Sequence, residues 1–123
     1  MQNIFIASTS LTPRIVLNSN TLEFSVSGKS CPEDGLTYYK FVTDYIETIK
    51  LSEIENFTFK FDLEYANTSS AKAFVNIIYK MQELNNPSVI WMYEQDDDEI
   101  LELGTDISTI VNVPFTFIIK KNQ

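Results

Sequence analysis

Residues 57–81 read FTFKFDLEYANTSSAKAFVNIIYKM, and this stretch decides the fold. Its first half alternates from Phe57 to Tyr65, with an apolar or aromatic side chain at every second position, which predicts a strand with one buried face. Its second half has apolar residues at spacings of three and four between Ala71 and Met81, which predicts an amphipathic helix. A strand that leads directly into a helix is typical of an α/β fold.

The run Asn67-Thr68-Ser69-Ser70 lies between that strand and that helix. It places three hydroxyl groups at a helix N-terminus, where free backbone N–H groups and the positive end of the helix dipole favour an anion. A helix cap needs only one such residue. Capping explains part of this run, and we interpret the rest as a phosphate acceptor, with Thr68 the best candidate.

The composition limits the class of protein. A chain of 123 residues with 44% hydrophobic residues is long enough for one domain, and we expect residues 1–123 to form one, with an ordered core over about 12–120. Nine basic against 17 acidic residues give a net charge of −8. This charge argues against binding to nucleic acid or to anionic lipid, and it favours a basic protein partner.

The chain shows no signal for export or for a membrane. Its single cysteine, Cys31, excludes an intramolecular disulfide. The first residues have no basic group before a short apolar patch, so no signal peptide is predicted. No apolar run approaches the ~18 residues of a membrane span. We therefore expect a cytoplasmic protein.

Several kinds of catalytic site are excluded by composition. The chain contains no histidine, so Cys-His and Ser-His pairs are excluded, and the commonest zinc ligand and general base are missing. Its three glycines do not cluster into a phosphate-binding loop. We predict a protein without enzyme activity, catalytic residues, bound metal or cofactor.

Two alternatives stay open. The acidic run Glu94–Glu99 is best explained as a solvated loop with acidic residues in the first turn of a helix. The functional alternative for the same run is a metal-dependent phosphatase or hydrolase that uses Asp96–Asp98. The other alternative is a constitutive structural or oligomerising protein that associates through an open sheet face.

The periodicity along the chain predicts the order β-β-α-β-α-β-α-β. The first ten residues are expected to be a loose lead-in, residues 28–35 a loop, and residues 89–93 the most buried strand, because their apolar run is continuous. The predicted strands cover residues 15–17, 22–26, 57–65, 89–93 and 115–119, and the predicted helices cover residues 38–49, 68–85 and 97–111.

This order predicts a mixed, mostly parallel sheet, since strands separated by helices run parallel. Because three of the strands alternate apolar with polar residues, we expect two layers, with the helices on one face of the sheet and the other face open to water. The carboxyl ends of the parallel strands then share one edge. That edge would bring together the loops Ser30–Gly35, Ala66–Ser70 and Glu94–Asp98.

Five short motifs occur in order along the chain: Thr12-Pro13, GKSCPE at 28–33, YANTSSAK at 65–72, Trp91-Met92-Tyr93 and Val113-Pro114-Phe115. In these motifs the chain resembles the SiaC-family regulatory phosphoproteins, over about residues 12–120. These are small bacterial proteins with a STAS-like fold, similar to that of anti-sigma-factor antagonists. The resemblance implies a STAS-like two-layer domain and a switch rather than a catalyst.

In that family the threonine that matches Thr68 is phosphorylated by a dedicated kinase and dephosphorylated by a PP2C-type phosphatase. The resemblance therefore implies that the unphosphorylated chain binds and activates a signalling partner such as a diguanylate cyclase, which favours biofilm, and that phosphorylation releases it. The partner-binding residues expected on this basis are Ser30, Pro32, Glu33, Tyr65, Asn67, Thr68, Ser69, Ser70 and Lys72.

Overall fold

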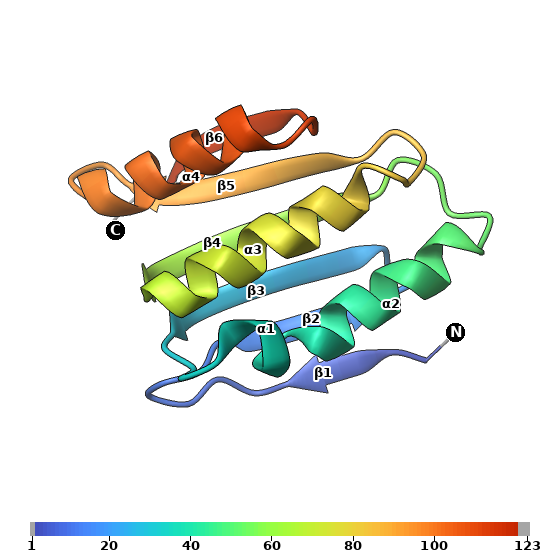
Figure 1. The fold of residues 1–123 in the computed structure, drawn as a ribbon, viewed down its shortest axis with the longest axis horizontal. Coiled ribbons are helices and arrows are strands. Elements are labelled where there is room, and N and C mark those ends of the chain that lie inside the picture. Colours follow the sequence, from blue (N-terminus) through green and yellow to red (C-terminus); the bar gives the residue numbers. More distant parts are fainter. Residues whose placement is uncertain (1, 121–123) are drawn as a thin grey trace.

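The computed structural model describes residues 2–120, which form a six-stranded sheet with helices packed on one face (Figure 1). The strands are β1 (Ile4–Ile6), β2 (Arg14–Asn18), β3 (Glu23–Ser30), β4 (Thr58–Ala66), β5 (Ser88–Glu94) and β6 (Phe115–Lys120). The helices are α1 (Gly35–Tyr38), α2 (Lys40–Lys50), α3 (Thr68–Met81) and α4 (Asp98–Ile110). None of the helices in this described part of the chain is long and apolar enough to cross a membrane.

The strands lie side by side in the order β1-β2-β3-β4-β5-β6, which is also their order in the chain. β1, β2 and β3 pair antiparallel, and β3 to β6 pair parallel. Each step from β3 to β6 returns through helical structure, as parallel pairing requires. The mixed, mostly parallel sheet and the two-layer arrangement predicted from the sequence are confirmed.

The core lies between the helices and one face of the sheet. On β4 the predicted alternation holds, since Phe59, Phe61 and Leu63 are buried. The Phe61 ring lies 5.1 Å from the ring of Phe74 in α3 and 5.2 Å from that of Trp91 in β5, centroid to centroid. Aromatic contacts of this kind join the central strands to the helix layer.

The N-terminal segment differs from the prediction. Residues 4–6 were expected to be a loose lead-in, but they form β1 and pair with Ile15–Leu17. That prediction was wrong because a three-residue strand is too short to show a period, and its stability comes from the neighbouring strand rather than from its own sequence.

The predicted loop at residues 28–35 was also too long. β3 continues to Ser30 through a register shift at Gly28, whose φ is +110°.

β5 is not the most buried strand, contrary to prediction. Val89 and Trp91 are buried, whereas Ile90 and Met92 are only half-buried. Since the helices cover one face of the sheet, even a continuous apolar run turns every second side chain towards the open face.

The first predicted helix is divided in two. Asp34 caps the short α1, and Tyr39 separates α1 from α2. The apolar spacing that predicted this helix is confirmed in α2, where Val42, Ile46 and Ile49 are buried.

We predict that Gly104→Ala destabilises the fold. A β-carbon at this position in α4 would lie 2.5 Å from Nε1 of Trp91, and that nitrogen is held by its 2.9 Å hydrogen bond to the carbonyl of Ile100. The added methyl gains ~1 kcal/mol of helix propensity, but overpacking a core costs roughly 1–3 kcal/mol. We expect a net loss in urea unfolding followed by the fluorescence of Trp91. Thr105→Ala, at an exposed site on the same helix, is the control, and an unchanged or higher midpoint for Gly104→Ala would contradict the prediction.

Candidate functional site

Asn67 ties together the loops that follow β3 and β4. Its backbone N–H donates to the carbonyl of Ser30 at 3.0 Å, and its Nδ2 donates to the carbonyl of Pro32 at 2.9 Å. Its Oδ1 accepts from the N–H of Ser70 at 2.8 Å, which makes Asn67 the N-cap of α3. A single residue therefore sets where the loop after β3 lies and where α3 begins.

A buried chain of hydroxyl groups supports this junction. Ser30 Oγ lies 2.6 Å from Tyr39 Oη and 2.6 Å from Ser70 Oγ, and Ser70 Oγ donates to the carbonyl of Ser30 at 2.9 Å. Since each hydroxyl has one proton, Tyr39 donates to Ser30, which donates to Ser70. Burial raises the pKa of the Tyr39 hydroxyl well above its usual value, so it stays protonated as a donor.

α1 is fastened to the start of α3 through Gly35 and Ser69. The N–H of Gly35 donates to Ser69 Oγ, and a β-carbon on Gly35 would clash with the carbonyl oxygen of Ser69. Only glycine allows this approach. The preceding Asp34 accepts hydrogen bonds from the hydroxyl and the N–H of Thr37, at 2.8 and 3.2 Å, which lower the pKa of its carboxyl group.

Thr68 is the exposed hydroxyl of the run. It is the first residue of α3 and is open to solvent, whereas Ser69 is half-buried and Ser70 is fully buried. Among the described residues we find no hydrogen-bond partner for the N–H groups of Thr68 and Ser69. These free donors and the helix dipole together favour negative charge beside the Thr68 side chain.

Two depressions flank Thr68. One, of about 440 Å³, is lined by Glu33, Leu36 and Lys72 among others, and the other, of about 280 Å³, by Tyr65 and Asp97 among others. Acidic side chains line both, and each also holds an exposed apolar or aromatic side chain, since Leu36 is 52% and Tyr65 47% exposed. The surface around Thr68 is therefore mostly acidic, with one exposed apolar or aromatic side chain in each depression.

The structure brings all the predicted site residues to the same edge of the sheet, but at different depths. Glu33, Tyr65, Thr68 and Lys72 are exposed, and Asn67 and Ser69 are half-buried. Ser30, Pro32 and Ser70 are buried. In this structure these three residues lie beneath the exposed ones and hold them in place, and they do not form part of the surface.

Sequence reasoning missed three residues of this site. Gly35 and Tyr39 hold the scaffold, and Leu36 contributes exposed apolar surface. Tyr39 falls within the helix predicted over residues 38–49, and the sequence does not indicate a partner for its hydroxyl. The Asp34-Gly35 pair is a turn signal that could have marked the start of α1, but nothing in the sequence indicates that Leu36 is exposed.

The acidic run after β5 forms a helix start. Asp97 is the N-cap of α4 and accepts from the N–H of Ile100 at 3.0 Å, and Asp98 and Glu99 lie in the first turn. This matches the interpretation of the run as a complement to the helix dipole. Within residues 2–120, no group of three or more acidic or cysteine side chains is arranged to hold a metal ion.

The sequence matches a known protein family over most of its length. Residues 6–120 match the family described as SiaC family regulatory phosphoprotein. The chain belongs to the SiaC family. A protein of Pseudomonas aeruginosa strain UCBPP-PA14 that carries no functional name is 26% identical to it over 119 residues, which are 94% of each chain.

Two solved structures from the same species share the fold of this SiaC-family chain. The crystal structure of apo-SiaC from Pseudomonas aeruginosa has a TM-score of 0.82 at 26% identity and covers 96% of this chain and 99% of its own. The crystal structure of the diguanylate cyclase SiaD in complex with its activator SiaC contains a chain with a TM-score of 0.83 at 25% identity. The match covers 95% of this chain and 99% of that one. The α/β fold expected from the sequence is therefore that of SiaC.

We predict that the Asn67 junction contributes measurably to stability. Asn67→Ala removes both the cap of α3 and the bond to Pro32, so it should cost about 1–2 kcal/mol in urea unfolding. Asn67→Ser keeps a side-chain acceptor for the N–H of Ser70 and loses only the donor to Pro32, without adding charge, so it should cost clearly less. Equal stability of the alanine variant and the parent would contradict the role of this junction.

Proposed function

We propose that this chain is a phosphorylation-switched activator protein that works by binding rather than by catalysis. In its unphosphorylated form it binds a diguanylate cyclase and raises the activity of that enzyme. A phosphate on Thr68 releases the partner. The single observation that carries this proposal is the exposed hydroxyl of Thr68 at the start of α3, in a chain that belongs to a family of regulatory phosphoproteins.

The likeness to SiaC supports the choice of partner. SiaC of Pseudomonas aeruginosa is described as the activator of SiaD, a diguanylate cyclase, and its chain in that complex matches 95% of this chain. We extend that role to this chain, with a diguanylate cyclase of its own organism as the partner. Regulation of biofilm through cyclic di-GMP would follow from such an activity.

The effect of a phosphate follows from its charge. Phosphorylation would add a charge of about −1.5 to −2 at Thr68. In the free protein, water, the free N–H groups of α3 and the ammonium of Lys72 one helical turn away can stabilise that charge. A partner packed on Leu36 and Tyr65 would have to remove water from the phosphate without supplying new donors. Because burying an unpaired charge is costly, phosphorylation favours the released state.

The enzymes that act on Thr68 belong to the same proposal. The exposed side chain at a helix start is accessible to a protein kinase, and the phosphorylated form would be accessible to a PP2C-type phosphatase. The chain itself would then be the substrate of both enzymes and would need no cofactor.

We predict that the protein isolated from its own organism carries phosphate on Thr68. Peptide mapping by mass spectrometry should place the modification on Thr68 and leave Ser70 unmodified, because that hydroxyl is buried. Phosphate found only on Ser70, or on neither residue under any growth condition, would contradict the proposed switch.

We also predict opposite effects of two substitutions at Thr68. Thr68→Ala should bind the diguanylate cyclase as tightly as the unphosphorylated parent, because it adds no charge. Thr68→Glu should weaken binding at least tenfold, because its carboxylate must be desolvated in the complex. Calorimetry would measure affinity, and the rate of cyclic di-GMP formation would measure activation.

Thr105→Glu is the matched control, since it adds the same charge at another exposed threonine, on α4. It should leave both measurements unchanged. Equal binding by Thr68→Glu and the parent would overturn the switch, whereas equal losses in Thr68→Glu and Thr105→Glu would point to net charge rather than to the site.

A further inference from the structure

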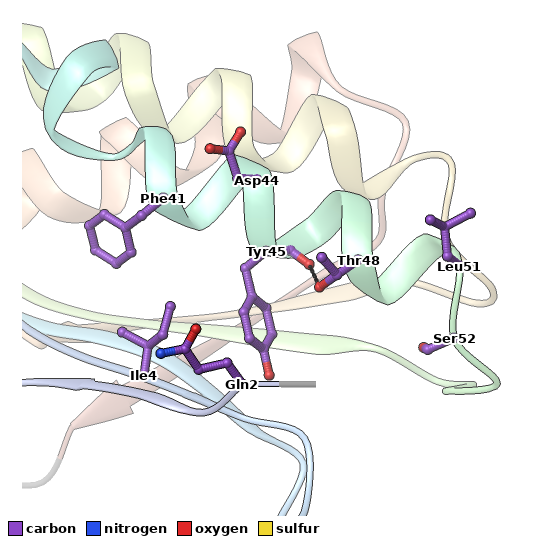
Figure 2. A pocket seen from close by; sticks show the side chains of 8 residues that line it. All are labelled: Gln2, Ile4, Phe41, Asp44, Tyr45, Thr48, Leu51 and Ser52. Carbon is purple, nitrogen blue, oxygen red and sulfur yellow. Dashed lines mark hydrogen bonds between the residues drawn. The ribbon is translucent and has the colours of Figure 1, made fainter.

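A cavity of about 500 Å³ lies between α2 and the N-terminal strand, apart from the residues around Thr68 (Figure 2). Its apolar lining comes from Ile4, Phe41, Leu51 and the ring of Tyr45. Asp44, Thr48 and Gln2 add polar groups to its wall. A mostly apolar cavity of this size with a few polar groups is typical of a small-molecule site.

The hydroxyl of Tyr45 is the unusual group of this cavity. Tyr45 is only 5% exposed, and its Oη is buried without a hydrogen-bond partner among the described residues. An unsatisfied buried hydroxyl costs roughly 1–3 kcal/mol. Phenylalanine would fill the same space beside Phe24, whose ring centroid lies 6.1 Å from that of Tyr45, without this cost. Packing therefore explains the ring of Tyr45 but not its hydroxyl.

We propose that this cavity binds a small neutral molecule with an apolar body and a hydrogen-bond acceptor, such as a ketone oxygen, that pairs with the Tyr45 hydroxyl. The apolar side chains of Ile4, Phe41 and Leu51 line the cavity and would contact the apolar body of the ligand. An anion is disfavoured by the carboxylate of Asp44 and by the net charge of −8. A cation gains little, because Asp44 is already paired with Lys40 at 2.9 Å.

The cavity is open to solvent, so a ligand can enter it. Figure 2 shows the Tyr45 ring directed from α2 towards Gln2, which is exposed and lines the same cavity. The Tyr45 oxygen itself is buried, so a ligand in the cavity reaches it only by displacing the side chains packed over it. At the other end Leu51 is 89% exposed, so a ligand would give this side chain the apolar contact that it lacks.

The test is a titration of the full chain, followed by NMR, with two aromatic probes of similar size. Acetophenone has a carbonyl acceptor, and ethylbenzene has none. We expect acetophenone to bind saturably in the millimolar range usual for so small a ligand, with shifts confined to the cavity residues. Tyr45→Phe should weaken the binding of acetophenone about two- to tenfold, because one hydrogen bond is lost. The affinity for ethylbenzene should stay unchanged.

Two variants complete the design. Tyr79→Phe removes a hydroxyl from an exposed tyrosine on α3 and should change nothing. Thr48→Leu should fill part of the cavity and weaken both probes. The proposal is overturned if acetophenone does not saturate, if Tyr45→Phe binds it as tightly as the parent, or if signals of the cavity residues broaden with protein concentration alone, which would make a second copy of the chain the occupant.

Discussion

The hydrogen bonds of Asn67 are the constraint on which the site depends. β3 and β4 are parallel neighbours, so their chain ends leave the sheet side by side and must turn back without leaving buried polar groups unpaired. Asn67 donates one hydrogen bond to the end of β3 and one to the loop after it, and accepts one from the first turn of α3. This fixes the register of α3, and with it which hydroxyl of the run faces solvent.

Because of this register, the run from Asn67 to Ser70 contains both a buried serine that supports the site and an exposed threonine at its surface. Ser70 faces inward, into the hydroxyl chain with Ser30 and Tyr39, whereas Thr68 faces outward. The hydrogen bonds found between described residues do not include the Thr68 side chain. A charge added at Thr68 therefore changes what the surface presents to a partner while the bonds beneath it stay intact. The proposed switch would therefore act on binding rather than on folding.

Tyr39 and Tyr45 show that two buried tyrosines can have different roles. Tyr39, between α1 and α2, is buried and pairs with Ser30, so its hydroxyl is part of the scaffold. Tyr45, two turns further along, is equally buried, but its hydroxyl has no partner among the described residues. Since both rings pack against the core, only the hydrogen-bond partners in the folded structure distinguish the paired hydroxyl of Tyr39 from the unpaired one of Tyr45.

The sequence by itself determined the strand that ends at Tyr65, the helix that begins at Thr68 and the one-sided sheet, because these follow from local period and capping chemistry. It also predicted that the loops around Thr68 gather at one edge of the sheet, where the candidate site lies. Only the tertiary structure decided that Ser30, Pro32 and Ser70 are buried, that Ile4–Ile6 is a strand, and that Ile90 faces the open side of the sheet. How deeply a residue is buried and which strand it pairs with depend on contacts between segments far apart in the chain. No local sequence pattern predicts these contacts.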